Sequence, residues 1–145
     1  MGSGKTTIGK HLSEELDYKF KDLDQAVENE EQQTISELFS KKGEIYFRKK
    51  ERTILEKILS SNTNIVLAIG GGTPCFGDTM SFIKSSKDTI SIYLKSSHNE
   101  LTDRLFNKRL KRPLIAHITS PELLSDFIKK HLFERSYFYN QSEIK

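Results

Sequence analysis

The chain has 145 residues, a length that fits one compact domain and excludes a second full one. Its net charge of +3 is too small to indicate a nucleic-acid partner by itself, and 30% charged against 35% hydrophobic residues is a soluble balance. Cys75 is the single cysteine, so no intrachain disulfide can form, and this usage fits a reducing cytoplasm. The longest apolar run, Ile65 to Ile69, is far shorter than the ~20 residues of a membrane span, which excludes a membrane protein.

The chain opens on a glycine-rich segment that runs into a helical pattern. Gly2-Ser3-Gly4-Lys5-Thr6-Thr7 matches the second half of the phosphate-loop motif G-x-x-x-x-G-K-S/T. In that motif backbone N–H groups surround phosphate oxygens, the lysine reaches the β- and γ-phosphates, and the hydroxyl after it ligates Mg²⁺. Ile8, Leu12 and Leu16 predict an apolar helix stripe over about residues 5–17. A flexible Gly-Ser start is the competing interpretation.

Both ends of the chain lack parts that this pattern leads us to expect. The first glycine of the full motif would lie before Met1, and an apolar strand should precede it. At the other end, the chain stops at Lys145 directly after a helical pattern, without a closing strand. We therefore expect a fragment clipped at both ends.

An acidic pair follows the first helical segment. Alternation over Lys19 to Leu23 predicts a short strand, on which Phe20, Asp22 and Asp24 point to one side if the strand continues that far. One carboxylate can then serve Mg²⁺, and the other can orient an attacking hydroxyl and accept its proton. The alternative is a solvated strand end.

The middle of the chain predicts two consecutive helices. Thr34-Ile35-Ser36-Glu37 is a capping box that begins the first, Gly43 is a plausible stop, and the second runs to about Leu59. The second helix carries a seam that includes Glu51, with Arg48 three residues away as its candidate partner; the other seam positions are Phe47, Ile54 and Ile58. An arginine fixed in this way can present its planar fork to a substrate carboxylate, whereas the alternative is an exposed ion pair.

The remaining segments complete an α/β alternation. Ile65 to Ile69 predicts a parallel strand inside the sheet, covered on both faces, and Gly70-Gly71-Gly72 after it permits close approach to a ligand. Thr89 to Leu94 predicts another strand. Helical segments are predicted between the two strands, around 80–83, and after the second strand, around 100–106. Ser120-Pro121 begins a helix that continues towards Tyr139, after a basic loop over 108–119.

Five cations lie between positions 104 and 112, four of them inside the basic loop: Arg104, Lys108, Arg109, Lys111 and Arg112. Such a run is usually a solvated face, but a mobile basic segment can also close over a nucleotide and stabilise charge during phosphoryl transfer. The four histidines show no metal-ligand spacing, and Cys75 has no partner thiol, so we assign chemistry to none of them.

These motifs, in order and together with Arg112-Pro113-Leu114 and Glu134-Arg135-Ser136-Tyr137, resemble shikimate kinase over nearly the whole chain. The resemblance implies a three-layer α/β P-loop kinase fold over 1–145, with a five-stranded parallel sheet whose first strand is missing here, a substrate-binding region at about 24–60 and a lid at about 108–120. It implies transfer of a phosphoryl group from ATP, with Mg²⁺, to shikimate to give shikimate 3-phosphate in the route to chorismate and the aromatic amino acids. A monomer in the cytoplasm, with no nucleic-acid or membrane partner, is expected.

The resemblance also implies residue roles by position. Asp24, Lys5 and Arg112 correspond to catalytic residues, and the segment Gly2, Ser3, Gly4, Lys5, Thr6 and Thr7 with Arg112 to the nucleotide site. Substrate contacts correspond to Asp24, Arg48, Gly70, Gly71, Gly72 and Arg135, and metal-side positions to Thr6 and Asp22. Glu51 corresponds to the residue that orients Arg48, and Arg104 or Arg109 to the adenine-side arginine. A related kinase acting on gluconate, or an inactive nucleotide-binding relic, is the alternative, and we expect residues 1–145 alone not to be a competent kinase.

Overall fold

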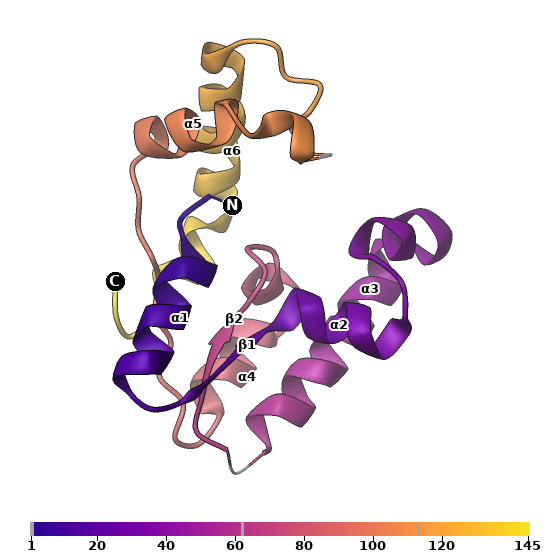
Figure 1. Ribbon diagram of the computed structural model, residues 1–145, viewed down its shortest axis with the longest axis vertical. Coiled ribbons are helices and arrows are strands. Elements are labelled where there is room, and N and C mark those ends of the chain that lie inside the picture. Colours follow the sequence, from indigo (N-terminus) through magenta and orange to yellow (C-terminus); the bar gives the residue numbers. More distant parts are fainter. Residues whose placement is uncertain (1, 62, 113) are drawn as a thin grey trace. The chain divides into compact units, whose positions relative to one another are not determined.

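The computed structural model describes residues 2–61, 63–112 and 114–145 (Figure 1). It contains two compact units, one of Lys5–Thr89 and one of residues 2–4 with 90–145. The elements of the first unit are α1 (Lys5–Glu15), β1 (Lys19–Asp22), α2 (Leu23–Glu31), α3 (Ile35–Leu59), β2 (Ile65–Ala68), the 3₁₀ turn η1 (Thr73–Cys75) and α4 (Thr79–Ser85). Those of the second are α5 (His98–Phe106), the 3₁₀ turn η2 (Arg109–Lys111) and α6 (Pro121–Tyr139).

The first unit has a layer of helix on each face of a parallel sheet (Figure 1). β1 and β2 pair in register from Lys19 opposite Ile65 to Asp22 opposite Ala68. Ile65 and Leu67 pack against the core that α3 contributes to, so β2 is covered on both faces as predicted. Within the described residues the sheet consists of these two strands, and the prediction that β2 lies inside a larger sheet is wrong for them.

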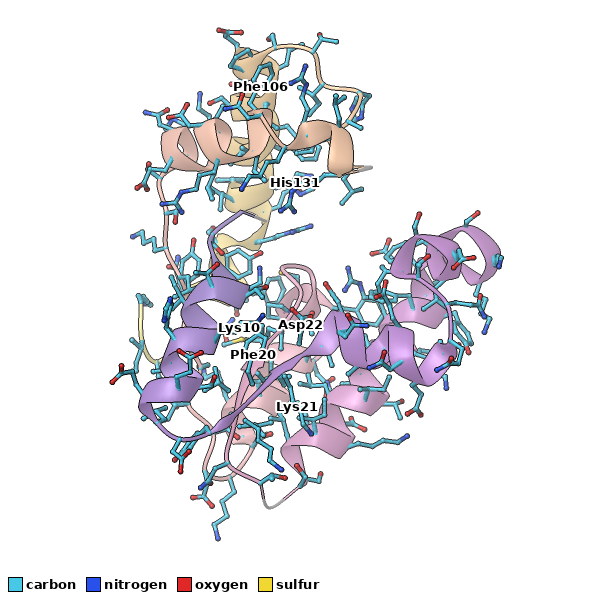
Figure 2. All side chains as sticks on the ribbon, viewed as in Figure 1. Lys10, Phe20, Lys21, Asp22, Phe106 and His131 are labelled. Atoms are coloured by element: carbon cyan, nitrogen blue, oxygen red, sulfur yellow. The ribbon has the colours of Figure 1, made fainter. Side chains whose placement is uncertain are left out.

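The helix predicted after the glycine-rich start is present as α1, but its buried face differs from the predicted stripe. Gly9 and Ser13 are the buried residues, whereas Ile8 and Leu16 are each 47% exposed. A Cβ at Gly9 would lie 2.7 Å from the ring of Phe20, which is labelled in Figure 2. The small residues therefore face the sheet because they allow α1 and β1 to approach closely.

The second helix of the chain, α2, was not predicted, and it changes the geometry of the acidic pair. Asp22 ends β1 and is the N-cap of α2, where its Oδ1 accepts hydrogen bonds from the backbone N–H groups of Asp24 and Gln25 at 3.0 and 3.4 Å. Leu23 and Val27, on the inner face of α2, are completely buried. The interpretation of Asp24 as a strand residue is wrong, because it lies in the first turn of α2.

The capping box at Thr34 and Glu37 is confirmed at the start of α3, and so is the interruption at Gly43. Gly43 has φ 80° and ψ 168° inside an otherwise helical run, so α3 consists of two helical segments that meet there. A positive φ of this size costs glycine little and other residues considerably more. The predicted seam is buried, with Phe47, Glu51, Ile54 and Ile58 all at most 8% exposed.

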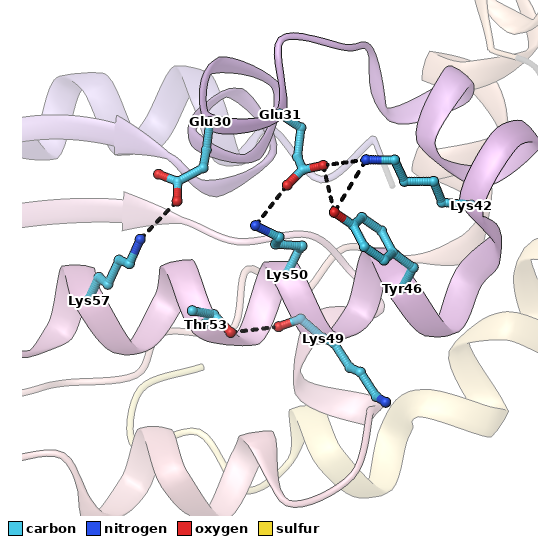
Figure 3. Close-up of polar contacts among 8 residues, drawn as sticks. All are labelled: Glu30, Glu31, Lys42, Tyr46, Lys49, Lys50, Thr53 and Lys57. Atoms are coloured by element: carbon cyan, nitrogen blue, oxygen red, sulfur yellow. Dashed lines mark hydrogen bonds and ion pairs between the residues drawn. The ribbon is translucent and has the colours of Figure 1, made fainter.

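A carboxylate at the end of α2 connects it to both segments of α3 (Figure 3). The side chain of Glu31 is 7% exposed. Its carboxylate forms ion pairs with Lys42 Nζ and Lys50 Nζ and accepts a hydrogen bond from Tyr46 Oη, each at 2.9 Å. Lys42 precedes the break in α3, and the other two follow it. The cluster therefore fixes the two segments of α3 against α2, and Arg48 lies on the second of them.

The second unit contains a separate core of Leu101, Leu105, Ile115, Ile118, Leu124 and Ile128, built from α5, α6 and the segment between them. The predicted start of α6 is confirmed, because the Ser120 side chain caps Leu123 N–H and Pro121 lies in the first turn. The strand predicted over Thr89 to Leu94 is wrong: this segment forms a single bridge, between Ile92 and Ile144. Of the helices in the described part of the chain, none has the length and apolar character needed to cross a bilayer.

Candidate active site

The phosphate-loop segment leads directly into α1. Gly2 and Gly4 have φ of 76° and 87°, a left-handed conformation that glycine adopts at little cost. α1 begins at Lys5, and the first N–H groups of a helix have no partner within it, so this end attracts anions. Thr6 and Thr7 are exposed in that first turn. A glycine-rich start at the N-terminus of a helix suits phosphate groups, and this role of the segment stays a prediction.

The acidic pair lies at the carboxyl end of β1. Asp22, labelled in Figure 2, uses Oδ1 as the cap of α2, which leaves Oδ2 outside the cap. The pKa of the Asp24 carboxyl is raised above its ordinary value, first by desolvation and then by the charges of Asp22 and Glu51. The positive charges of Lys5 and Arg48 oppose this rise, so both cations act on Asp24. A raised pKa makes this carboxylate a better proton acceptor.

Arg48 and Glu51 form the pair that the sequence predicted, and it is buried. Arg48 Nη1 lies 2.7 Å from Glu51 Oε2, and the two side chains are 13% and 3% exposed. The interpretation as an exposed ion pair is therefore wrong. The guanidinium also stacks over the Phe47 ring at 5.1 Å and reaches Glu44 at 3.4 Å, so its plane is held from several directions.

The glycines after β2 allow the arginine and the carboxylates to come close to the backbone. A Cβ at Gly72 would overlap the Arg48 guanidinium. A Cβ at Gly70 would lie 3.3 Å from oxygens of both Asp24 and Glu51. The first unit thus gathers a guanidinium, two carboxylates and an uncovered backbone at one end of the sheet, an arrangement that suits a small ligand with a carboxylate and hydroxyls.

Sequence reasoning missed one member of this group, Thr73. It is 1% exposed, and its hydroxyl donates to Glu51 Oε1 at 2.7 Å. Its place directly after the triple glycine was the available signal. Among the described residues, no group of three or more histidine, cysteine, aspartate or glutamate side chains could hold a metal ion.

The arginines predicted for the lid and for a further substrate contact belong to the second unit. Arg112 follows η2 and Arg135 lies on α6, and both are half-buried. Of the two adenine-side candidates, Arg104 pairs loosely with Glu100 at 3.8 Å, whereas Arg109 stacks on Phe106 at 4.1 Å and donates to its carbonyl. Pro113 of the predicted lid motif lies outside the described residues. The roles of these arginines stay predictions.

A phosphate loop at the start of a helix, followed by an acidic pair at the end of a parallel strand, defines the chain as a P-loop kinase. A model of the shikimate kinase family matches residues 1–145. Shikimate kinase of Flavobacterium psychrophilum is 42% identical over 140 residues, which cover 97% of this chain and 80% of that protein. Shikimate kinase of Flavobacterium johnsoniae is 41% identical over 145 residues, covering 100% of this chain and 83% of that protein.

Solved structures agree with these sequence relatives. Shikimate kinase from Bacteroides thetaiotaomicron has a TM-score of 0.85 at 35% identity, covering 99% of this chain and 79% of that one. Shikimate kinase from Acinetobacter baumannii, solved in complex with shikimate, has a TM-score of 0.82 at 32% identity, covering 97% and 74%. The chain belongs to the shikimate kinase family. Its P-loop kinase fold, its class as a phosphotransferase and its use of ATP with Mg²⁺ are confirmed.

Proposed function

We propose that this chain transfers the γ-phosphoryl group of ATP to a hydroxyl of shikimate and produces shikimate 3-phosphate. One observation carries the choice of acceptor: the Arg48 guanidinium is fixed by a buried Glu51 and lies against Gly72, beside the Asp24 carboxylate. A planar fork in a fixed position suits a carboxylate of the acceptor, and the neighbouring aspartate suits its hydroxyls. Gly70 and Gly71 complete the substrate contacts that we propose within the first unit, and the substrate contact expected of Arg135 stays a prediction.

The chain's own residues account for the proton and the charges in this reaction. Asp24 orients the acceptor hydroxyl and takes its proton as the new oxygen–phosphorus bond forms, and its raised pKa favours that role. Lys5 and the backbone N–H groups around Gly2, Ser3 and Gly4 hold the phosphates, and Arg112 stabilises charge on the transferring group.

The metal-side residues fit a hydrated Mg²⁺. Thr6 is exposed in the first turn of α1, and Asp22 keeps Oδ2 outside the helix cap, so the two supply the hydroxyl and carboxylate oxygens that this ion prefers. When bound, Mg²⁺ neutralises phosphate charge during transfer. We propose that the residues act within one domain, with a substrate-binding region at about 24–60 and a lid at about 108–120, in a cytoplasmic monomer.

The test is acceptor-dependent ADP release with ATP, Mg²⁺ and a panel of hydroxy acids. Residues 1–145 alone are assayed beside a version that also carries the first strand and C-terminal segment of a shikimate kinase. In the extended version we expect release with shikimate and little with gluconate, whereas residues 1–145 alone are expected to release little ADP with either. Release with gluconate in preference to shikimate would assign the chain to a different acceptor. ATP binding without any acceptor-dependent release would indicate an inactive relic.

A further inference from the structure

Thr73 connects the glycine loop to α3. It opens η1 directly after Gly72, is 1% exposed, and donates its backbone N–H to the carbonyl of Gly70 at 3.1 Å. Its hydroxyl donates to Glu51 Oε1 at 2.7 Å. One buried residue therefore closes the turn of the loop and reaches the carboxylate that holds Arg48.

The two oxygens of Glu51 are held from different elements. Oε2 accepts from Arg48 Nη1 on the same helix, and Oε1 accepts from Thr73. A carboxylate held at one oxygen can rotate about its last torsion, whereas donors at both oxygens fix its plane. Because Glu51 is 3% exposed, water cannot readily replace a lost donor. The orientation of the Arg48 guanidinium therefore depends on both donors to Glu51.

The Thr73 hydroxyl also distinguishes two neighbouring carboxylates, Glu51 and Asp24, because it donates to Glu51. The position of a Cβ on Gly70 lies 3.0 Å from Thr73 Oγ1 and 3.3 Å from oxygens of both Asp24 and Glu51. A threonine hydroxyl has one proton to donate, and here it goes to Glu51. Glu51 is thereby committed to holding Arg48, while Asp24 faces the same space as the proton acceptor.

We propose that Thr73 is a positioning residue for acceptor binding, whose hydroxyl fixes Glu51 and through it the guanidinium of Arg48. The assignment rests on the proposed function, because it makes Arg48 the partner of the acceptor carboxylate. Thr73 acts through Glu51 and is given no contact with the reacting atoms. Loss of its hydroxyl should therefore weaken acceptor binding and leave ATP binding unchanged.

The experiment measures the effect of the hydroxyl on KM in the purified protein by two comparisons. The first compares the wild type with Thr73→Val, and the second compares Thr73→Ser with Thr73→Ala. We expect Val and Ala to raise KM for shikimate about tenfold to a hundredfold, as for a hydrogen bond to a charged group, while KM for ATP and kcat change little. Thr73→Ser should retain a near-normal KM. Thr102→Val is the matched control, since Thr102 is 6% exposed and its hydroxyl donates only to the carbonyl of His98 in α5.

The outcomes separate this assignment from the proposed function. Equal KM for shikimate in Thr73→Val, Thr73→Ala and the wild type, even with a lowered Tm, would show a structural role alone and overturn the assignment. A Thr73→Ser variant as impaired as Thr73→Ala would do the same. Calorimetric titration of shikimate gives a second readout without turnover. A wild type that neither turns over nor binds shikimate would overturn the proposed function, and the assignment with it.

Discussion

Glu51 and Glu31 are two carboxylates of neighbouring helices that each accept several hydrogen bonds, and their donors differ in kind. Glu51 is held by an arginine and a buried hydroxyl, Arg48 and Thr73. Glu31 is held by two lysines and a phenol, Lys42, Lys50 and Tyr46 (Figure 3). Both glutamate side chains are less than 8% exposed, but the lysines on Glu31 are each 35% exposed, whereas Arg48 is 13% exposed.

The difference shows that a buried glutamate with cationic partners can either orient a group that binds a ligand or hold two helices together. A guanidinium that gives one edge to Glu51 still has further N–H groups, and here it lies against the side-chain-free backbone of Gly72. A lysine ammonium is a compact charge on a flexible stem, and the pair of lysines on Glu31 faces solvent. We therefore infer that the Glu51 cluster orients a ligand and the Glu31 cluster holds α2 to α3.

The largest expected effect is on kcat, and it compares Asp24, the proposed base, with Glu31, which holds α2 to α3. Asp24→Asn should lower kcat about 10²–10⁴-fold with little change in KM for ATP, because asparagine cannot accept the proton. Glu31→Gln, the control, should leave kcat near that of the wild type. Steady-state kinetics with each substrate varied measures both. An Asp24→Asn enzyme of near-normal kcat would remove Asp24 from the proposed mechanism.

The next effect concerns stability. Glu51→Leu removes the buried partner of the Arg48 guanidinium and leaves it only the exposed Glu44 at 3.4 Å, and the loss of a buried partner costs about 3–5 kcal/mol of unfolding free energy. Glu31→Leu should cost clearly less, because its lysines can turn to water. Urea unfolding of both variants beside the wild type gives the comparison. Equal losses would mean that the two clusters do not differ in the way described above.

A smaller effect, on KM for shikimate, tests whether position 48 requires arginine or only a positive charge. Arg48→Lys should raise KM for shikimate about tenfold to a hundredfold, because an ammonium cannot hold Glu51 and a second carboxylate with a planar fork. The control is Lys50→Arg on the Glu31 cluster, where KM should not change. If Arg48→Lys binds shikimate normally, charge alone is sufficient there.

The smallest effect is a pH dependence of stability. Hydrogen bonds from Lys50, Lys42 and Tyr46 lower the pKa of Glu31 from 4.5 to about 2. A group whose pKa is lower in the folded state stabilises that state above its ordinary pKa, and this contribution disappears as pH falls from 4.5 towards 2. The unfolding free energies of wild type and Glu31→Gln should therefore differ at pH 7 and converge over this window, as measured by urea unfolding at several pH values. A constant difference would contradict the assignment.

The sequence predicted those parts of the fold that rest on local signals. The capping box at Thr34, the break at Gly43 and the start of α6 at Ser120 all depend on residues within one turn of each other, and all are confirmed. The Arg48–Glu51 pair is likewise three residues apart on one helix. Each of these follows from geometry that a short segment carries by itself.

The errors arise where tertiary contacts decide. The alternating pattern predicted that Asp22 and Asp24 belong to one strand. The Asp22 side chain instead caps α2, a helix that buries Leu23 and Val27. The segment 89–94 alternates as a strand does, yet it forms one bridge, to Ile144. Spacing along the chain cannot show which partner strand is present or which face of a helix is covered.

The parallel register of β1 and β2 has a consequence for the order in which the protein is made. Asp22 lies opposite Ala68, and two parallel strands cannot be joined by a tight turn, so the whole of α2 and α3 must be synthesised between them. On the ribosome, the acidic pair therefore emerges well before the glycine loop that completes its surroundings. Loop closure must come before these contacts can form. Until Thr73 has left the exit tunnel, Glu51 lacks its second donor and the proposed acceptor site is incomplete.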